Sequence, residues 1–432
     1  MVAAKEGSLK ATITVAMSNY LEAGSIVAGA GGLTLWMEYL NLNDAKLGLL
    51  GALSANGFGS AIGAFLGGIL VDKFGRKFIY KYDLLVYMLG ILLIMFSFNF
   101  PMLLVGYVVT GIAVGAAIPA AWTYIAEEAP KGERAARVGW GQFAWSIGPA
   151  ITLFLSVLLA PLGLLGSRII FAQLFVVALI TWIMQQQINE STIWTEEKEK
   201  EKSQREVGKQ DVSWKQLFTV KANLKAIVLL VGIYVFWNLV AGVMGYFMPY
   251  IYETVGGLSA SQANLLQGFL WTLTVAATYF VFIKLGDRVN RKLLYGVGAG
   301  MGIAAWLVLT FGGMGMFELI TFVVLWGIAA GFGAQAFYGL WAGELFHTRY
   351  RAKAQGFIFA LARIAVGLIS LVVPLMITSL GFQSAGMIMI GFLVIAAVIG
   401  LIMAPETRGK SLEEIQEDRY GRAEERQRQA RN

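Results

Sequence analysis

Two ionisable side chains lie deep inside stretches of sequence that otherwise carry almost no charge. Glu22 lies about ten residues into the apolar run 12–39, and Arg363 lies about nine residues into the run 354–380. At about 1.5 Å per helical residue, each would lie roughly 15 Å from the end of its helix, the middle of a bilayer core about 30 Å thick. A charge at that depth costs several kcal/mol, so both residues are candidates for function.

The two side chains suit different chemistry. A buried carboxyl group such as that of Glu22 can bind and release a proton, although Glu22 could instead be a structural residue satisfied by hydrogen bonds. The guanidinium of Arg363 keeps its charge and offers a planar fork that fits a carboxylate or a sulfonate. If Arg363 binds a ligand, that ligand is anionic or strongly polar; otherwise it serves as a fixed partner for Glu22 or for a carbonyl group.

Further polar and aromatic residues lie at helical spacing within other apolar runs. Amides bind hydroxyl groups as donors and as acceptors, and aromatic faces stack on sugar C–H surfaces. Any one of them is more typical of packing, but together they predict a polar, aromatic-lined site for a small solute. These candidates are Asn19, Asn238, Tyr246, Gln267, Trp271, Gln335, Tyr338 and Trp341.

The composition indicates the class of protein that holds these residues. Of 432 residues, 57% are apolar and only 14% are charged, whereas a soluble domain carries about 25% charged residues. The chain has no cysteine and one histidine, which excludes disulfides and thiolate sites and disfavours Ser-His-Asp catalysis. We therefore expect an integral membrane protein that is not an enzyme, with no cofactor and no metal. The net charge of +7 is typical of cytoplasmic loops and does not indicate nucleic-acid binding.

Twelve apolar runs are long enough to cross a bilayer as helices. They are continuous, without the alternation of a membrane β-barrel, so the predicted fold is all-α with twelve transmembrane helices. The runs cover 12–39, 46–71, 79–98, 102–128, 136–160, 167–187, 223–253, 259–285, 292–312, 316–345, 354–380 and 383–404.

The basic residues predict the orientation. With the N-terminus inside, 31 of the 34 Lys and Arg residues fall on the cytoplasmic side, which is what the positive-inside rule requires. Lys46 and Arg168 then lie outside, and Arg363 lies within a run. We expect a multi-pass protein of the cell membrane with both termini in the cytoplasm and the lipid bilayer as its surroundings.

The chain contains an internal repeat of half its length. Three pairs of acids in similar local sequences recur at nearly one interval: Asp72 and Asp287 are 215 residues apart, Glu127 and Glu344 are 217, and Glu190 and Glu406 are 216. This pattern indicates a duplicated unit of six helices. We predict two bundles, residues 1–190 and 223–404, joined by a cytoplasmic linker at 191–222 and followed by a cytoplasmic tail at 405–432.

The repeated motifs combine acids with arginines at the cytoplasmic ends of the runs. An Asp there can accept hydrogen bonds from the N-terminus of a neighbouring helix, and the arginines can pair with acids at other helix ends. Such contacts could hold the two bundles together in one state and release them in another; alternatively they only fix the topology. The predicted gate residues are Asp72, Arg76, Glu127, Arg134, Asp287, Arg291, Glu344 and Arg351.

These motifs resemble the major facilitator superfamily, and within it the sugar porter group and its organic-acid relatives. The segment Gly68 to Lys77 is similar to the superfamily signature after the second span. The tail Pro405-Glu406-Thr407-Arg408-Gly409 followed by Leu412-Glu413-Glu414-Ile415 is similar to the motif that ends the last span of sugar porters. The resemblance covers the whole chain, but Asn189-Glu190-Ser191-Thr192 and Tyr107 depart from the sugar porter pattern.

The resemblance implies a transporter that works by alternating access. Glu22 lies where proton-coupled relatives carry an acid, Arg363 lies one residue from a substrate-binding amide, and Gln142 looks like the glutamine of the group's Asn-Gln-Phe in span 5. We expect a proton-coupled symporter that imports a carbohydrate, a polyol or a sugar-derived organic acid. The alternatives are a proton-driven exporter of drugs or metabolites, and a membrane receptor that does not transport.

Overall fold

The computed structural model describes residues 9–130, 132–206, 214–348 and 351–421, and within these ranges every regular element is a helix. The longer helices are α1 (Leu9–Gly31), α2 (Leu33–Leu40), α3 (Asp44–Leu53), α4 (Phe58–Phe74), α5 (Arg76–Met95), α6 (Phe100–Glu128), α7 (Arg134–Leu159), α8 (Leu164–Gln185), α9 (Thr192–Glu206), α11 (Lys221–Thr254), α12 (Ala260–Ala277), α13 (Arg291–Gly312), α14 (Met316–Phe332), α15 (Ala334–Glu344) and α16 (Arg351–Met403). The short ones are α10 (Trp214–Thr219), α17 (Leu412–Gln416), η1 (Ala160–Leu162), η2 (Thr278–Ile283) and η4 (Glu417–Gly421).

Ten of the described helical stretches are long and apolar enough to cross a membrane. Two features explain the difference from the twelve predicted runs. The stretch α16 holds the last two runs, because its two helices follow one another directly through a kink at Gly381, whose φ of 79° is not helical. The first run, which α1 and α2 together match, is not among the ten, because α1 contains polar residues such as Ser18, Asn19 and Glu22.

Three predicted runs are broken in the structure near glycines. The run 12–39 is interrupted at Gly32 between α1 and α2, and the run 316–345 is interrupted at Gly333 between α14 and α15. The run 46–71 is interrupted between α3 and α4, where Gly57 precedes the first residue of α4. Glycine has little helix preference, so the sequence allows a change of direction at these points.

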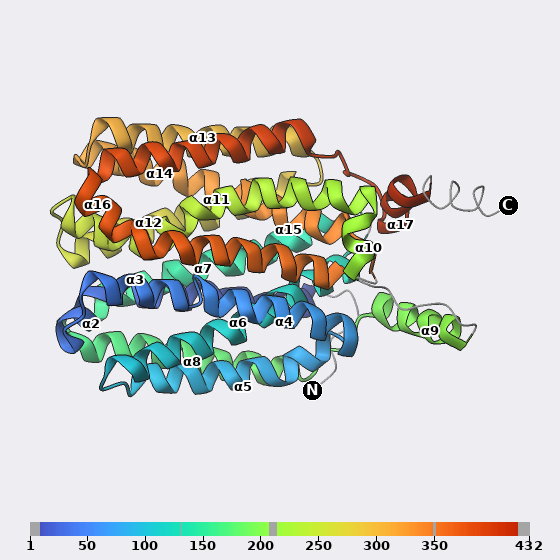
Figure 1. The fold of residues 1–432 in the computed structure, drawn as a ribbon, viewed down its shortest axis with the longest axis horizontal. Coiled ribbons are helices and arrows are strands. Elements are labelled where there is room, and N and C mark those ends of the chain that lie inside the picture. The colour runs from blue at the N-terminus through green and yellow to red at the C-terminus, as the bar shows by residue number, and fades with distance from the viewer. Residues whose placement is uncertain (1–8, 131, 207–213, 349–350, 422–432) are drawn as a thin grey trace.

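The helices form two groups that lie side by side (Figure 1). We call α1 to α8 the N-half and α11 to α16 the C-half. The seam between them is made mainly by α4 against α16 and by α7 against α12. At Gly68 the approach is so close that a Cβ atom there would lie 2.6 Å from the carbonyl oxygen of Ala352. The boundaries given above for the two bundles, the linker and the tail, at residues 190, 222 and 404, remain a prediction.

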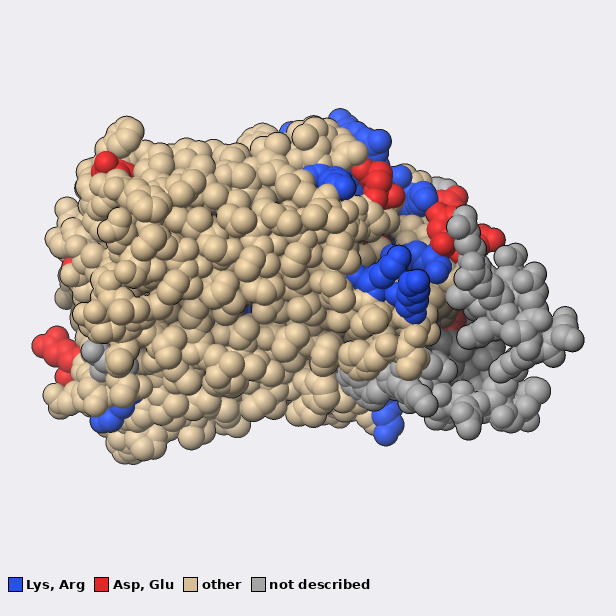
Figure 2. Space-filling model, turned by 45° about the horizontal axis from the view of Figure 1, so that its top comes forward, with Lys and Arg blue, Asp and Glu red and all other residues tan. Residues whose placement is uncertain are grey.

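The surface of the bundle suits a bilayer. Figure 2 shows a broad middle band that is almost free of charged residues, while Lys and Arg gather at one end of this face. Large apolar side chains are exposed on the bundle; Leu158 is 72% exposed and Leu368 is 56% exposed. In water such a surface would be unfavourable, so it indicates contact with lipid.

Candidate functional site

A narrow cavity lies between the two halves. Its wall comes from α1, α7, α11, α12, α15 and α16, and from the segment between α3 and α4. Apolar residues make up much of the wall. The polar and aromatic side chains that line it are Asn56, Trp145, Trp237, Asn238, Trp271, Gln335 and Arg363.

The two ionisable residues found in the sequence meet beside this cavity. A guanidinium N–H of Arg363 donates to Oε1 of Glu22, and both side chains are almost completely buried. The indole N–H of Trp145 donates to the other carboxylate oxygen of Glu22 at 3.0 Å. The carboxylate of the N-half is therefore neutralised by a cation of the C-half, across the seam.

Aromatic rings pack against Arg363 and against Trp145, the indole donor to Glu22. The guanidinium carbon of Arg363 lies 4.7 Å from the centroid of the Phe359 ring, one turn earlier on α16. The ring of Trp145 packs edge-to-face against that of Trp271, with centroids 5.1 Å apart. These contacts stabilise a buried cation and shield the pair from water.

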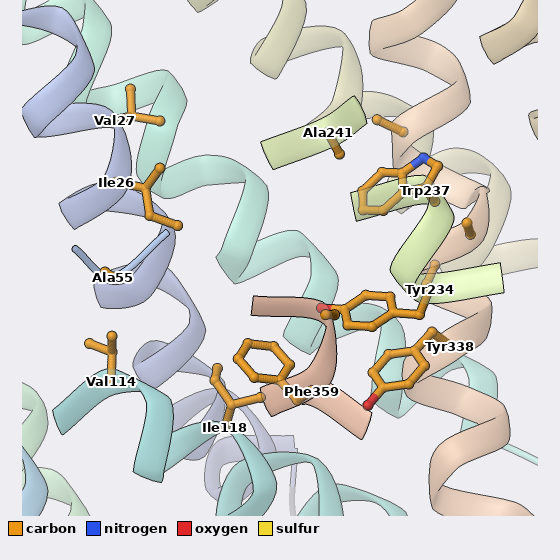
Figure 3. Close-up of a cluster of buried hydrophobic side chains, with 14 of the residues drawn as sticks. Ile26, Val27, Ala55, Val114, Ile118, Tyr234, Trp237, Ala241, Tyr338 and Phe359 are labelled. Carbon is orange, nitrogen blue, oxygen red and sulfur yellow. The ribbon is translucent and has the colours of Figure 1, made fainter. Parts of the chain in front are cut away.

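An aromatic cluster closes one side of the cavity. Tyr234 and Tyr338 stack with centroids 3.6 Å apart, and Trp122 of the N-half packs edge-to-face against Tyr338 at 5.2 Å. Figure 3 shows Tyr234, Tyr338 and Phe359 gathered at the seam beside Ile118 of the N-half. This cluster would have to part for a solute to leave the cavity in that direction.

The opposite side of the cavity is closed by amide side chains. The Asn56 side chain donates to the carbonyl oxygen of Gly242 at 3.1 Å, and the Asn264 side chain donates to that of Gly31 at 3.1 Å. Each bond joins one half to the other.

Glu127 is the centre of the first of two ion-pair clusters at one end of the seam. Its carboxylate accepts from Arg76 of the same half at 2.8 Å and from Arg351 of the other half at 3.0 Å. The hydroxyl of Ser191 donates to its second oxygen at 2.7 Å. Nearby, the backbone N–H of Lys353 at the start of α16 donates to Asp72 at 2.9 Å.

Glu344 is the centre of the second cluster, which mirrors the first. It accepts from Arg291 of its own half at 3.0 Å and from Arg134 of the other half at 3.1 Å, and Thr407 donates to it at 2.6 Å. Asp287 accepts from the backbone N–H groups of residues 135 and 136, at the start of α7, at 3.2 and 3.0 Å. The duplicated sequence thus produces a duplicated set of contacts, each with one arginine from each half. We call this the ion-pair end.

The structure brings only some of the predicted site residues to the cavity. Asn238, Trp271, Gln335 and Arg363 line it. Asn19 and Gln142 instead bond to the carbonyl oxygens of Gly141 and Ala330. The predicted residues that are buried away from the cavity wall are Tyr246, Gln267, Tyr338 and Trp341.

Sequence reasoning missed three polar or aromatic residues of this site. Trp145 binds Glu22, Asn56 bonds across the seam, and Trp237 lines the cavity. Asn56 and Trp145 could have been found in the sequence, because both lie in apolar runs. An amide or an indole N–H in such a run needs a hydrogen-bond partner. Trp237 precedes Asn238, which was singled out.

The sequence matches the family model described as Sugar (and other) transporter over residues 36–418. The chain is 49% identical over 414 residues to the minor myo-inositol transporter IolF of Bacillus subtilis (strain 168), covering 95% of this chain and 94% of that protein. It is 25% identical over 425 residues to the glucose transporter GlcP of Staphylococcus epidermidis, covering 90% and 92%.

Solved structures share the architecture. The proton:xylose symporter XylE, a major facilitator superfamily protein bound to 6-bromo-6-deoxy-D-glucose, matches with a TM-score of 0.79 at 20% identity. The match covers 96% of this chain and 100% of that one. The two chains therefore have the same fold.

Proposed function

Because this chain belongs to the Sugar (and other) transporter family, we propose that it is a proton-coupled symporter that imports a neutral polyol or sugar, with myo-inositol as the first candidate. The ion pair between Glu22 and Arg363 at the cavity carries this proposal. It supplies both a reason for a neutral ligand and a group that can bind the proton.

The charge of Arg363 favours a neutral ligand. Its guanidinium already has a carboxylate partner, and it is the only charged side chain on the described cavity wall. An anionic ligand would have to displace Glu22 or be buried without a counter-charge, and either is costly. The remaining polar groups, the amides of Asn56, Asn238 and Gln335, suit hydroxyl groups. Relatives named as transporters of myo-inositol and glucose support this substrate class.

Glu22 can couple proton binding to the movement of the two halves. When a proton binds this carboxylate, the charge that holds Arg363 is lost, and the seam loses a bond between the two halves. Proton binding at Glu22 is therefore linked to separation of the halves at the cavity. A relative described as an arabinose-proton symporter supports proton coupling.

The ion-pair end supports alternating access. Opening there breaks the contacts of Arg351 with Glu127 and of Arg134 with Glu344. Each glutamate keeps an arginine of its own half and a hydroxyl donor, so neither glutamate is left buried without a partner. This arrangement lowers the cost of opening, since an uncompensated buried charge costs about 3–5 kcal/mol.

The orientation proposed from the sequence places the ion-pair end in the cytoplasm. The basic residues in Figure 2 gather at the end of the bundle where α9 and α17 lie in Figure 1. With this orientation, the amide bonds of Asn56 and Asn264 close the outer side of the cavity, and the aromatic cluster closes its inner side.

The proposal is tested with purified protein in proteoliposomes and radiolabelled myo-inositol. An inward proton gradient should drive accumulation, and a protonophore should abolish it while leaving counterflow exchange intact. Accumulation that does not depend on the proton gradient would contradict proton coupling. Efflux of substrate against proton influx would favour the exporter, and no movement of myo-inositol, glucose or arabinose would contradict this substrate class.

A further inference from the structure

A buried carboxyl group on α5 takes no part in the cavity or in the ion-pair end. Asp83 is 6% exposed. One carboxylate oxygen accepts the backbone N–H of the next residue, Leu84, at 2.7 Å, and the other has no hydrogen-bond partner in the described chain. No described basic residue forms an ion pair with it. An ionised carboxylate in such a place would be very costly, which favours the protonated form of Asp83.

Asp83 belongs to a group of polar residues between α1, α5 and α8. This group lies inside the N-half and is separate from the seam between the two halves; we call it the polar seam. One turn beyond Asp83, the Tyr87 hydroxyl is 2.7 Å from the Ser25 hydroxyl of α1. From α8, the Gln185 side chain donates to Ser18 of α1 at 3.0 Å. Ser18, Glu22 and Ser25 recur at the i, i+4 and i+7 spacing of one helix face, so Glu22 lies at the edge of this seam.

Several buried polar atoms of this seam have no protein partner. They are the second oxygen of Asp83, the hydroxyl of Tyr80, and the side-chain oxygens of Gln173 and Gln185. Buried polar groups in native proteins are satisfied by protein or by ordered water. Four such atoms on the neighbouring helices α5 and α8 therefore favour ordered water in the polar seam.

The seam exists in only one of the two repeats. Arg76 and Arg291 correspond, as do Tyr80 and Tyr295, both at an interval of 215 residues; by the same interval Asp83 corresponds to Gly298, and Tyr87 to Gly302. Those glycines line a cavity in the C-half whose wall is otherwise mostly apolar. The last repeat motif, at an interval of 216 residues, relates Gln173 to Met389 and Gln185 to Leu401. The fold of the repeat does not require these polar residues, because the second repeat packs without them. Their presence in the first repeat alone therefore needs another explanation.

We propose that Asp83 is a proton relay of the N-half, which passes protons between Glu22 and the solution at the ion-pair end through water held between α1, α5 and α8. This inference rests on the proposed proton coupling at Glu22. The proton then has a path separate from that of the substrate. Asp83 lies on the eighth residue of α5, between Glu22 and the helix end at Arg76.

The transfer balances in protons and charge. Protonated Glu22 gives its proton to water of the seam and becomes the carboxylate that pairs with Arg363, as in this structure. Neutral Asp83 takes up that proton as it releases its own toward the helix end, so its charge does not change. One proton reaches the solution, and the guanidinium neutralises the charge left on Glu22.

No other described charge competes for this role. The titratable and charged groups on the elements that pack around Asp83 are Lys77, Tyr80, Lys81, Tyr82 and Tyr87 on α5, Tyr107, Tyr124, Glu127 and Glu128 on α6, Lys10, Tyr20 and Glu22 on α1, Arg168 on α8, Asp72 and Lys73 on α4, and Arg76 and Glu190 at the helix end. Arg76 is held by Glu127, and Arg168 lies in the first turns of α8, at the far end from Gln185. The phenols carry no charge near neutral pH, so Asp83 is the only carboxyl group between Glu22 and the helix end.

The test compares two modes of transport in proteoliposomes with radiolabelled myo-inositol. Counterflow exchange needs no net proton movement, whereas gradient-driven uptake does. Asp83→Asn should leave counterflow unchanged and slow driven uptake by about tenfold or more, since a positioned proton carrier accelerates a transfer by roughly a hundredfold or more. Asp83→Glu should restore driven uptake. The infrared band of a protonated carboxyl group should be present in the wild type and weaker in Asp83→Asn.

The control is Tyr82→Phe, one residue away on the lipid-facing side of α5, where the side chain is 46% exposed. Driven uptake of Asp83→Asn equal to that of Tyr82→Phe overturns the relay, as does an equal loss of both transport modes in a folded protein. If Asp83→Asn does not fold, Tyr87→Phe decides, because it breaks the seam at Ser25: normal driven uptake overturns the relay and slowed driven uptake with normal counterflow supports it. A wild type without gradient-driven uptake would instead refute the proposed coupling itself.

Discussion

At the scale of single residues, the proposed coupling depends on the carboxylate of Glu22, whose two oxygens bind two different helices. One oxygen accepts a hydrogen bond from Arg363 and the other accepts one from Trp145. A proton that binds Glu22 would therefore have to replace a buried ion pair. The ring of Phe359, which lies against the guanidinium, would continue to stabilise that cation.

Replacing Glu22 by glutamine should abolish accumulation of substrate and the dependence of uptake on pH. The amide is close in size to the carboxyl group but cannot carry a proton, so the exchange of substrate across the membrane should persist. Accumulation and counterflow in proteoliposomes measure the two effects. Normal uphill uptake by the folded Glu22→Gln protein would show that the proton binds elsewhere.

A matched pair of ligands tests the charge of the substrate. Glucose should bind the wild type about tenfold or more tighter than glucuronate, a difference of about 1.4 kcal/mol or more, because the charge of Arg363 is already neutralised. Arg363→Lys should not improve glucuronate binding, since lysine can keep the pair with Glu22. Tighter binding of glucuronate to the wild type, lost in Arg363→Lys, would instead assign the guanidinium to an anionic ligand. Isothermal titration calorimetry measures all four affinities.

At the scale of the elements, the two halves are joined at helix N-termini. Asp72, at the end of α4, accepts the N–H of residue 353 near the start of α16, and Asp287 accepts two N–H groups at the start of α7. The N-terminus of a helix carries partial positive charge, so a carboxylate there is stabilised. Both contacts join the two halves, so the proposed opening at the ion-pair end would break them.

Replacing Asp72 by asparagine should weaken this closed state by about 1 kcal/mol, the usual size of such a helix-end interaction. Transport should slow while the affinity for substrate stays nearly unchanged, because Asp72 does not line the cavity. Asp287→Asn is the matched variant of the other repeat and should behave alike. Initial uptake rates and equilibrium binding separate the two effects, and an equal loss of turnover and binding would argue against a gate.

At the scale of the whole molecule, each glutamate of the ion-pair end joins one arginine of its own half to one of the other half. In the proposed mechanism the two kinds of arginine have different roles. Those that cross the seam would hold the closed state, and those within a half would keep the glutamate neutralised when the halves separate.

This difference predicts opposite behaviour for two kinds of variant. Arg351→Gln and Arg134→Gln should favour the state that is open at the ion-pair end, with little loss of thermal stability, because Glu127 and Glu344 each keep one arginine. Arg76→Gln should lower the stability of the open state by about 3–5 kcal/mol, since Glu127 would then lack a charged partner there. Thermal unfolding, and labelling of single cysteines introduced into this cysteine-free chain, measure both. Equal effects of Arg351→Gln and Arg76→Gln would contradict the two roles.

The sequence by itself determined the class of the protein, its helices and its repeat. Long apolar runs with few charges have no stable place except in a bilayer, and there each run must satisfy its own backbone as a helix. The same reasoning marked Glu22 and Arg363, since a charge in such a run is too costly to be there without a use.

Only the tertiary structure decided that these two charges meet, although they are 341 positions apart in the sequence. A local pattern shows how deep a residue lies and which face of its helix it occupies, but not which distant helix it faces. For the same reason Tyr246 and Trp341, equally plausible in sequence, turned out to be buried away from the cavity, while Trp145 turned out to bind Glu22. Partner choice depends on how the two halves are docked, and that is set by the close packing of many small residues along the seam, not by any single segment.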